Sequence, residues 1–309
     1  MPFFSIVIPL YNKANFILAT LKSVSNQTFE NYEIIIINDG STDDSLAKIE
    51  TLKLPKLSIH TQENKGLSAA RNRGISLALG QYVALLDADD IWKPTYLKSM
   101  FNLIKNYPNH QIFGCSYKES RNGRLMNIHT SFEAQQNQTS YILDDFFSAN
   151  YNQFIVDQSS LIFECNFIKT HKFNEHIDVG EDVDFYLNYF ASKQIIFLNR
   201  SLMIKNYDDK EQLSASKISE KRVPDLEQYK NRYSSNPTIQ KYIDIQFYKL
   251  AIKYTYENNK SKRQKCMIQI NPLHLSHKQR LLLKSPKWIM AGLRKFKFIA
   301  LKLNIRITT

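Results

Sequence analysis

Three carboxylates stand within four residues directly after an apolar run, at Asp87, Asp89 and Asp90. The preceding residues 82–86 have the composition of a buried strand, so the acids would lie at its carboxyl end, where ligands bind in open α/β sheets. Carboxylates in that place suit a hard divalent cation, which takes oxygen ligands and bridges them to the phosphates of a substrate. The alternative is a solvated acidic turn in which Asp90 caps a following helix.

The first 115 residues, which must position these acids, alternate short apolar runs with segments of helical spacing. This rhythm predicts a parallel, doubly wound sheet with helices between its strands. Because the carboxyl ends of parallel strands meet at one edge, Asn12, Asp39 and Asp87 should converge on one crevice. The expected strands are 5–10, 33–38, 57–61, 81–86, 111–117, 160–163 and 195–204, and the expected helices are 14–27, 43–52, 67–79 and 181–192.

A second acidic group, Glu181 and Asp182, stands at the start of the last of these helices. The free N–H groups and the dipole of a helix start favour the charged form of a carboxylate. We therefore expect Asp182 to keep the ordinary aspartate pKa of about 3.9 and to be ionised at neutral pH. An ionised carboxylate can take the proton from an attacking hydroxyl. The alternative is a group of acids that only caps the helix.

The chain of 309 residues is long enough for one large α/β domain and a smaller second part. Its three cysteines are odd in number, far apart and without metal-ligand spacing, which argues against a disulfide framework or a zinc site and fits a reducing compartment. The first residues lack the basic region of a signal peptide, and no apolar run approaches the ~18 residues of a membrane span. These features predict a cytoplasmic protein.

The formal charge of +12 is concentrated at the end of the chain. Residues 260–309 hold 13 Lys and Arg and no acid, so the first 259 residues hold 28 basic and 29 acidic residues, a net charge of −1. This distribution argues against a nucleic-acid-binding core and indicates a tail that seeks an anionic surface. From about residue 219 the pattern is helical, so we expect a catalytic domain over 1–217 and a basic helical region over 218–309.

Four segments at expected strand ends, residues 5–12, 36–43, 64–74 and 86–90, together resemble the family 2 glycosyltransferases of the GT-A fold, over residues 3–215. The resemblance implies an inverting transferase that moves a sugar from a nucleotide-sugar, most often a UDP-sugar, with Mn²⁺ or Mg²⁺ as cofactor. It implies that Asp89, the second acid of a DxD motif, binds the metal. It gives Asp182 the role of base, with Glu181 contacting the acceptor; the reverse assignment stays open.

The same resemblance implies a set of residues that bind the nucleotide-sugar. Asp39 would face the base, Asp87 the ribose, and Arg71 the base or a phosphate. The full set is Pro9, Tyr11, Asn12, Asp39, Asn64, Arg71, Asp87 and Ala88. Family members often carry a basic or histidine-containing loop after the last strand. Here residues 205–214 contain no histidine, which leaves the third protein ligand of the metal unassigned.

The expected role is synthesis of a bacterial-type surface glycan, lipopolysaccharide or capsule, on a lipid-linked acceptor. An apolar stripe at helical spacing over residues 288–303, flanked by lysines, predicts peripheral attachment to the inner face of the cell membrane. A catalytically silent scaffold with a polyanion-binding tail is the alternative of another class. A sugar-nucleotide pyrophosphorylase is disfavoured because residues 9–13 are not the glycine-rich loop that it needs after the first strand.

Overall fold

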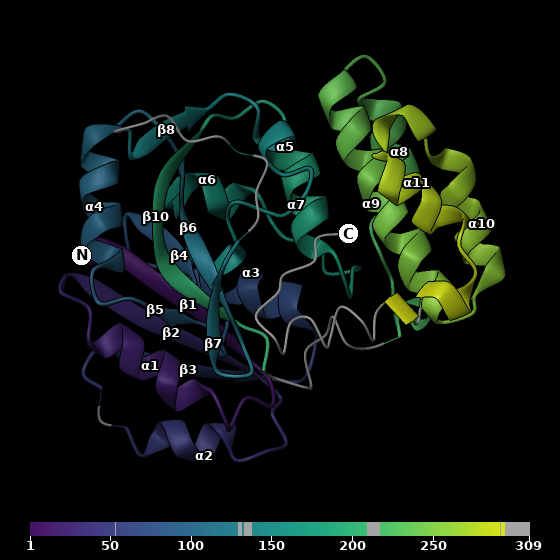
Figure 1. Ribbon diagram of the computed structural model, residues 1–309. Coiled ribbons are helices and arrows are strands. Elements are labelled where there is room, and N and C mark those ends of the chain that lie inside the picture. Colours follow the sequence, from purple (N-terminus) through teal and green to yellow (C-terminus); the bar gives the residue numbers. More distant parts are fainter. Residues whose placement is uncertain (53, 129–131, 133–137, 209–216, 291, 294–309) are drawn as a thin grey trace. The chain divides into compact units, whose positions relative to one another are not determined.

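The computed structural model describes residues 1–52, 54–128, 132, 138–208, 217–290 and 292–293. The chain divides into two compact units, Met1–Ala215 and Ser216–Thr309. The first is built on a sheet flanked by helices, and the second consists of helices (Figure 1).

A mixed sheet with the strand order β3-β2-β1-β4-β9-β6-β10-β5 is the framework of the first unit. Its first four strands are parallel, as the alternating pattern predicts: β1 (Phe4–Leu10), β2 (Tyr32–Asp39), β3 (Leu57–Gln62) and β4 (Tyr82–Leu85). Strand β9 (Leu161–Glu164) is antiparallel to β4 and to β6 (Ile112–Arg121). The predicted α/β class and mostly parallel sheet are confirmed.

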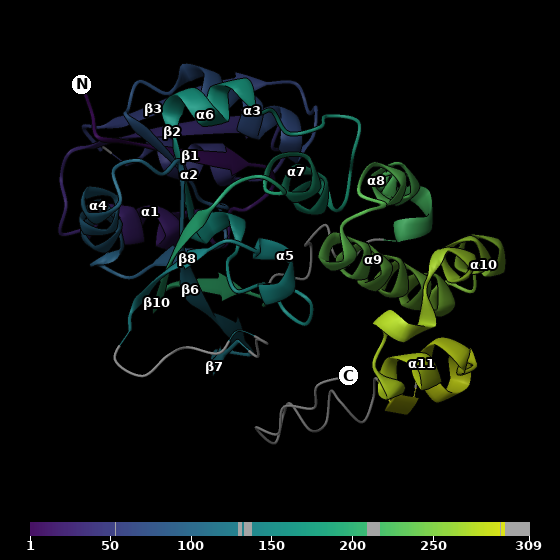
Figure 2. The same cartoon turned by 90° about the horizontal axis from the view of Figure 1, so that it is seen from above.

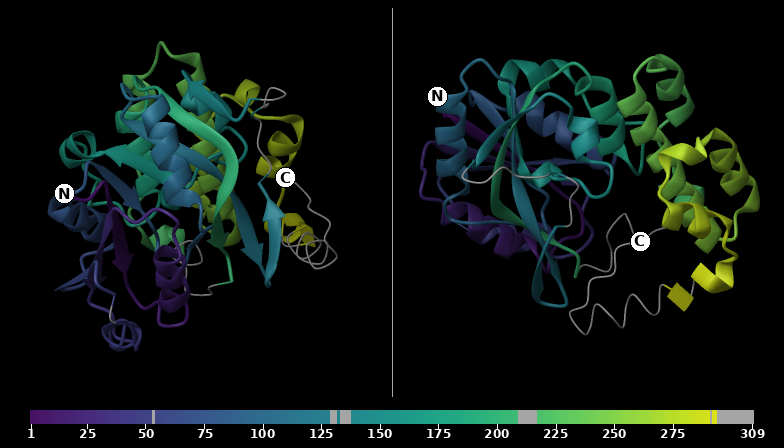
Figure 3. Two further views of the ribbon diagram at one scale, coloured as in Figure 1. Left: turned by 90° about the vertical axis from the view of Figure 1, so that its left-hand side faces the viewer. Right: turned by 45° about the horizontal axis from the view of Figure 1, so that its top comes forward.

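The far side of the sheet is built around β10 (Ile195–Asn206), which pairs in parallel with β6. Register shifts between Leu198 and Met203 bend this strand, because bulged residues add local twist; Figure 3 shows its curvature. Three short strands complete this side, β5 (Ile91–Trp92) and β8 (Ser140–Leu143) on β10 and β7 (Arg124–Asn127) on β6.

Helices cover both faces of the sheet (Figure 2). On one face α3 (Leu67–Leu77) packs on β1 and β2 beside α6 (Cys165–Thr170), and on the other lie α1 (Ile17–Ser25) and α4 (Tyr96–Asn106). A Cβ on Gly74 of α3 would lie 2.3 Å from Val7 Cγ1, so only glycine permits this close approach of helix and sheet. The remaining helices are α2 (Ser45–Glu50), α5 (Phe146–Ala149), α7 (Glu181–Tyr189) and the 3₁₀ helix η1 (Gln158–Ser160).

The second unit is organised around α9 (Pro237–Tyr256), on which α8 (Leu226–Arg232), α10 (Lys260–Gln269) and α11 (His277–Lys284) pack. Two 3₁₀ helices, η3 (Ile218–Glu220) and η4 (Pro272–His274), complete it. Among the described residues, no helix combines the length and the apolar composition needed to cross a membrane. The apolar stripe predicted over 288–303 lies mostly outside the described residues.

Candidate active site

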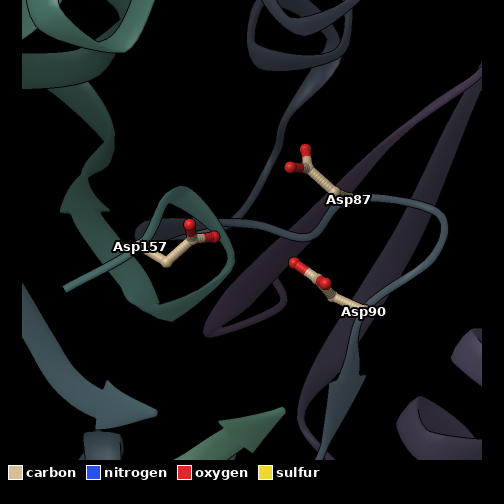
Figure 4. Close-up of side chains that lie close together, drawn as sticks. All are labelled: Asp87, Asp90 and Asp157. Atoms are coloured by element: carbon tan, nitrogen blue, oxygen red, sulfur yellow. The ribbon is translucent and has the colours of Figure 1, made fainter. Parts of the chain in front are cut away.

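Acidic side chains from two parts of the first unit meet beyond the end of β4. Asp87 and Asp90 follow that strand, and Asp157 precedes η1; each of the three offers an oxygen within 4.8 Å of the others. Figure 4 shows the side chains of Asp87, Asp90 and Asp157 around one region, with the carboxylates of Asp90 and Asp157 turned toward each other. An all-oxygen set of this kind fits Mn²⁺ or Mg²⁺. Sequence reasoning missed Asp157, because nothing local distinguishes it from an ordinary helix cap.

Asp90 is not the solvated turn residue of the alternative reading. Its side chain is buried, with one oxygen accepting from Ser159 Oγ at 2.6 Å and the other from the N–H of Asn206 at 3.0 Å. The next helix, α4, begins well beyond it and has Thr95 at its N-cap position, so that reading is wrong. Burial raises the pKa of Asp90 well above its ordinary value. Asp90 therefore links the loop after β4, residues 86–90, to Asn206 at the end of β10.

Asp89, the residue expected to bind the metal, lies beside this set of three and forms an ion pair with Lys13, with 2.8 Å between Nζ and Oδ2. Burial raises the pKa of the Asp89 carboxyl, and the charge of Lys13 opposes this effect. Lys13 belongs to the turn after β1, so the turns that follow β1 and β4 are joined by opposite charges. Asp89 itself is not one of the three acids whose oxygens lie within 4.8 Å of one another.

The segment in which the family resemblance led us to expect a basic or histidine-containing loop, residues 205–214, begins with a lysine, Lys205. Lys205, near the end of β10, places Nζ 2.8 Å from Asp157 Oδ2 and 3.9 Å from Asp90 Oδ2. Although burial by itself lowers the pKa of this ammonium group, the surrounding carboxylates raise it well above the ordinary value. Lys205 is therefore charged and partly neutralises the acids beyond β4.

Arg71 connects the acids of β4 to those of α7. Its guanidinium donates from Nη2 to Asp87 Oδ1 at 2.7 Å and from Nη1 to Glu181 Oε1 at 3.0 Å, and it lies over the Phe173 ring. The residue is buried, and its Nε–H has no hydrogen-bond partner in the part of the chain that the structure describes. The sequence led us to expect a guanidinium directed at a base or phosphate; the structure directs it at two carboxylates.

The pKa values of Asp87 and of Asp182, the neighbour of Glu181, are shifted in opposite directions. Burial raises the pKa of Asp87, but the charges of Arg71 and Lys205 outweigh burial and hold that pKa below the ordinary value. For Asp182, in the first turn of α7, burial, and next the charge of Glu181, raise the pKa to about 6, and the charge of Arg71 opposes this rise only in part. The expectation of an ordinary aspartate pKa was therefore wrong, because helix-start stabilisation is smaller than the cost of burial. At pH 7 this carboxyl is still mostly ionised.

The residues expected around the nucleotide base lie at the ends of β2 and β3. Asp39 is buried, and it accepts from Gln62 Nε2 at 2.7 Å and from the N–H groups of Lys65 and Gly66 at 2.9 and 2.8 Å. Asn64 stands in the same turn: a Cβ on Gly40, whose φ is +71°, would lie 2.9 Å from the Asn64 nitrogen. The structure thus brings Asp39 and Asn64 together.

The other residues expected to bind the nucleotide-sugar, Pro9, Tyr11, Asn12 and Ala88, differ in how far their side chains are exposed to solvent. Asn12 has a positive φ of 51°, and its Oδ1 accepts from the N–H of Thr42 at 2.8 Å, which joins the turns after β1 and β2. Tyr11 beside it is exposed. Pro9 and Ala88 are buried, so neither side chain is directed at solvent.

Loss of the Arg71 charge should destabilise the first unit. Removing one partner of a buried ion pair leaves an uncompensated charge and costs about 3–5 kcal/mol, and Arg71→Met would leave Asp87 and Glu181 unpaired together. We expect its free energy of unfolding in urea to fall by about this amount. Arg73→Met is the control, since Arg73 lies on the same helix in a more exposed position; an equal loss in both variants would contradict the bridging role.

A family model described as "Glycosyl transferase family 2" matches residues 5–171. The chain therefore belongs to glycosyl transferase family 2. This match covers β1 to β4, the acids that follow β4, and Asp157.

Curated relatives point to the same family. Glycosyltransferase GlyA of Streptococcus pneumoniae is 28% identical over 209 residues, which cover 64% of this chain and 30% of that protein. A glycosyltransferase of Rickettsia prowazekii, RP339, is 27% identical over 239 residues, which cover 75% of this chain and 71% of that protein. The chain thus spans less than a third of GlyA.

Solved structures share the fold. A crystal structure of S. aureus TarS, residues 1–349, in complex with UDP-GlcNAc superposes with a TM-score of 0.60 and 17% sequence identity, over 92% of this chain and 78% of that one. TarS 1–349 in complex with UDP gives a TM-score of 0.55 at 19% identity. At these identities the likeness defines the GT-A fold alone.

Proposed function

We propose that this protein is an inverting glycosyltransferase that moves a sugar from a UDP-sugar to a hydroxyl group of a growing glycan. The first unit is the catalytic, nucleotide-sugar-binding domain in this proposal. Family membership supports the class of reaction. The UDP-GlcNAc complex of the structural neighbour TarS makes a UDP-sugar, hexose or N-acetylhexosamine, the first donor to test.

One observation carries this proposal: Arg71 contacts both Asp87 after β4 and Glu181 at the start of α7. The acids proposed for donor binding and the acids proposed for proton transfer thereby belong to one charged network. A transferase needs this proximity, since the acceptor oxygen must reach the anomeric carbon of the bound donor. If Glu181 and Asp182 only capped α7, nothing would require Glu181 to share the buried guanidinium of Arg71 with Asp87.

The division of labour follows from the contacts. Asp39, Asn64 and the turns after β1 and β2 would bind the nucleoside. Asp89, with neighbouring oxygens of the Asp87–Asp90–Asp157 set, would hold Mn²⁺ or Mg²⁺. When bound, this ion neutralises charge on the departing nucleoside diphosphate. Lys205 lies among the same acids and adds a permanent positive charge. Asp182, mostly ionised at pH 7, would take the proton of the acceptor hydroxyl.

A thermal-shift panel of UDP-, GDP-, dTDP- and CMP-sugars, with and without Mn²⁺, tests the proposal. A ligand at 100 times its dissociation constant should add about 2.7 kcal/mol to the stability of the folded protein. We expect the UDP-sugars to give this shift and Mn²⁺ to be required. If none of these donors shifts the transition, the proposed donor is wrong, and the catalytically silent scaffold becomes the favoured alternative.

The acceptor belongs to the same proposal. We propose that it is a lipid-linked surface glycan, of lipopolysaccharide or capsule type, reached at the inner face of the cell membrane. The support is the charge distribution: the 13 basic residues from Lys260 onwards have no acidic counterpart, whereas the first 259 residues are nearly neutral. Such a segment gains roughly 1 kcal/mol per basic residue near an anionic leaflet.

A further inference from the structure

The second unit presents large apolar side chains to solvent where α10 ends and η4 begins. Ile268 is 71% exposed and Leu273 is 84% exposed. Ile268 lies in the last turn of α10 and Leu273 lies in η4, so the two residues stand on either side of the short connection between these elements. Single exposed leucines are common on protein surfaces, and exposure alone therefore indicates nothing.

The turn that carries Leu273 is, however, held in place by a buried charge. Asp244 of α9 is fully buried, and one of its oxygens accepts both from the N–H of Asn271 at 3.1 Å and from His274 Nδ1 at 2.6 Å. The two residues that it binds flank Leu273 in the chain. Asn271 Oδ1 in turn accepts from the N–H of Leu273 at 3.1 Å. The backbone on both sides of the leucine is thus fixed to the unit's central helix.

Asp244 is itself compensated within the unit. Its second oxygen lies 2.6 Å from the Nζ of Lys230, which comes from α8. Burying a carboxylate is costly unless it is paired and hydrogen-bonded. Here α8 and the turn 271–274 supply that pairing, and the product is a turn fixed to α9 with Leu273 at its tip. A loop free to fold its leucine inward would need no such anchor.

Exposed basic and apolar residues share helix faces in α10 and α11. On α10, Ser261, Lys265 and Ile268 share one exposed face at helical spacing, and on α11, His277, Leu281 and Lys284 share another. Trp288, just beyond α11, is 74% exposed. No acidic residue follows Glu257 in the sequence, whereas eight basic residues stand between Lys260 and Lys287.

We infer that the turn 271–274, with Ile268 and Trp288, is an interfacial anchor that inserts into an anionic lipid surface. The inference rests on the proposed function, in which the acceptor is lipid-linked, and it names the surface that reaches the lipid. A membrane interface stabilises both the exposed apolar side chains and the basic ones. Leucine, isoleucine and tryptophan side chains insert among the acyl chains, while anionic lipid headgroups attract lysine and arginine. The phosphates of a nucleic acid would attract the basic residues but would leave Leu273 in water.

The test is sedimentation of the full-length protein with vesicles of phosphatidylcholine that contain or lack phosphatidylglycerol, at low and at physiological salt. Leu273→Asp should lower the partition coefficient onto anionic vesicles by about tenfold or more, because a charge replaces an inserted side chain. Leu273→Ala should lower it by less. The matched control is Leu79→Asp, since Leu79 is 65% exposed in the first unit; it should bind vesicles like the unchanged protein.

Tryptophan fluorescence provides a second readout. The chain has two tryptophans, and Trp92 is buried, so a blue shift on adding anionic vesicles reports Trp288 entering the interface. Trp288→Phe should abolish the shift. Undiminished vesicle binding by Leu273→Asp, no binding by the unchanged protein, or binding to RNA in preference to vesicles would each overturn the inference.

The failure of this inference can be told apart from failure of the proposed function. A protein that is stabilised by a UDP-sugar and Mn²⁺ but does not bind anionic vesicles contradicts only the anchor. A protein that binds vesicles through Leu273 but responds to none of the nucleotide-sugars contradicts only the transferase proposal. Donor-induced stabilisation should be unchanged in Leu273→Asp and Leu79→Asp, and circular dichroism, which reports the helices of the second unit, checks that Leu273→Asp folds.

Discussion

Asp182→Asn should lower turnover by about 10²- to 10⁴-fold, the usual contribution of a general base, and should leave donor affinity nearly unchanged. The asparagine keeps the size of the side chain but cannot accept the acceptor's proton. Because Asp182 lies on α7 and not at the nucleotide-binding strand ends, the UDP-sugar should still stabilise the protein. Single-turnover transfer and thermal shift with donor, measured on the same variant, separate the two effects.

The pH dependence provides an independent check on the same residue. A base must be deprotonated, so the rate should rise with pH through about 6, the raised pKa of Asp182. Glu181 contributes to that raised value through its negative charge, so Glu181→Gln should move the rise to lower pH. If Glu181→Gln instead causes the larger loss of turnover, the roles of the two acids must be exchanged.

Asp89→Asn should abolish transfer and remove the Mn²⁺-dependent part of the stabilisation by the nucleotide. An amide is a weaker ligand for a hard cation than a carboxylate and carries no charge. The fold should survive, since the side chain of Lys13, the partner that Asp89 loses, is 18% exposed and so keeps access to water. Circular dichroism and unfolding without ligand check the fold, and thermal shift with UDP and graded Mn²⁺ checks the metal.

Asp157→Asn is the matched comparison for Asp89→Asn, because it removes a carboxylate from the neighbouring set of three without touching the DxD motif. We expect it to weaken Mn²⁺ dependence less than Asp89→Asn does. Full transfer by Asp89→Asn would contradict its role as metal ligand. Loss of Mn²⁺ dependence in Asp157→Asn alone would place the ion between Asp87, Asp90 and Asp157 instead.

Local patterns were sufficient to predict strands β1 to β4, β6, β9 and β10 of the first unit and its helices α1, α2, α3 and α7, but they did not predict α4, α5, α6 or the strands β5, β7 and β8. Strand β2 contains four consecutive isoleucines, and α3 follows a glycine and has small residues in its first turn, so each is recognisable from a few neighbouring residues. The acids after β4 and at the start of α7 could also be predicted, because strand ends and helix starts are places that a sequence marks. Their proposed roles came from the family resemblance, and they stay predictions.

Contacts between distant residues, by contrast, were decided only by the tertiary structure. Glu181 lies 110 residues from the Arg71 that binds it, and Asp90 lies 116 residues from the backbone N–H of Asn206. Asp157 and Lys205 join the acids for the same reason: antiparallel β9 and curved β10 bring chain segments together that no local pattern relates. The raised pKa of Asp182 depends on how deeply the folded unit buries the start of α7. Periodicity and capping act over a few residues, whereas ion pairing and desolvation depend on everything within a few ångströms of an atom, which the folded chain alone determines.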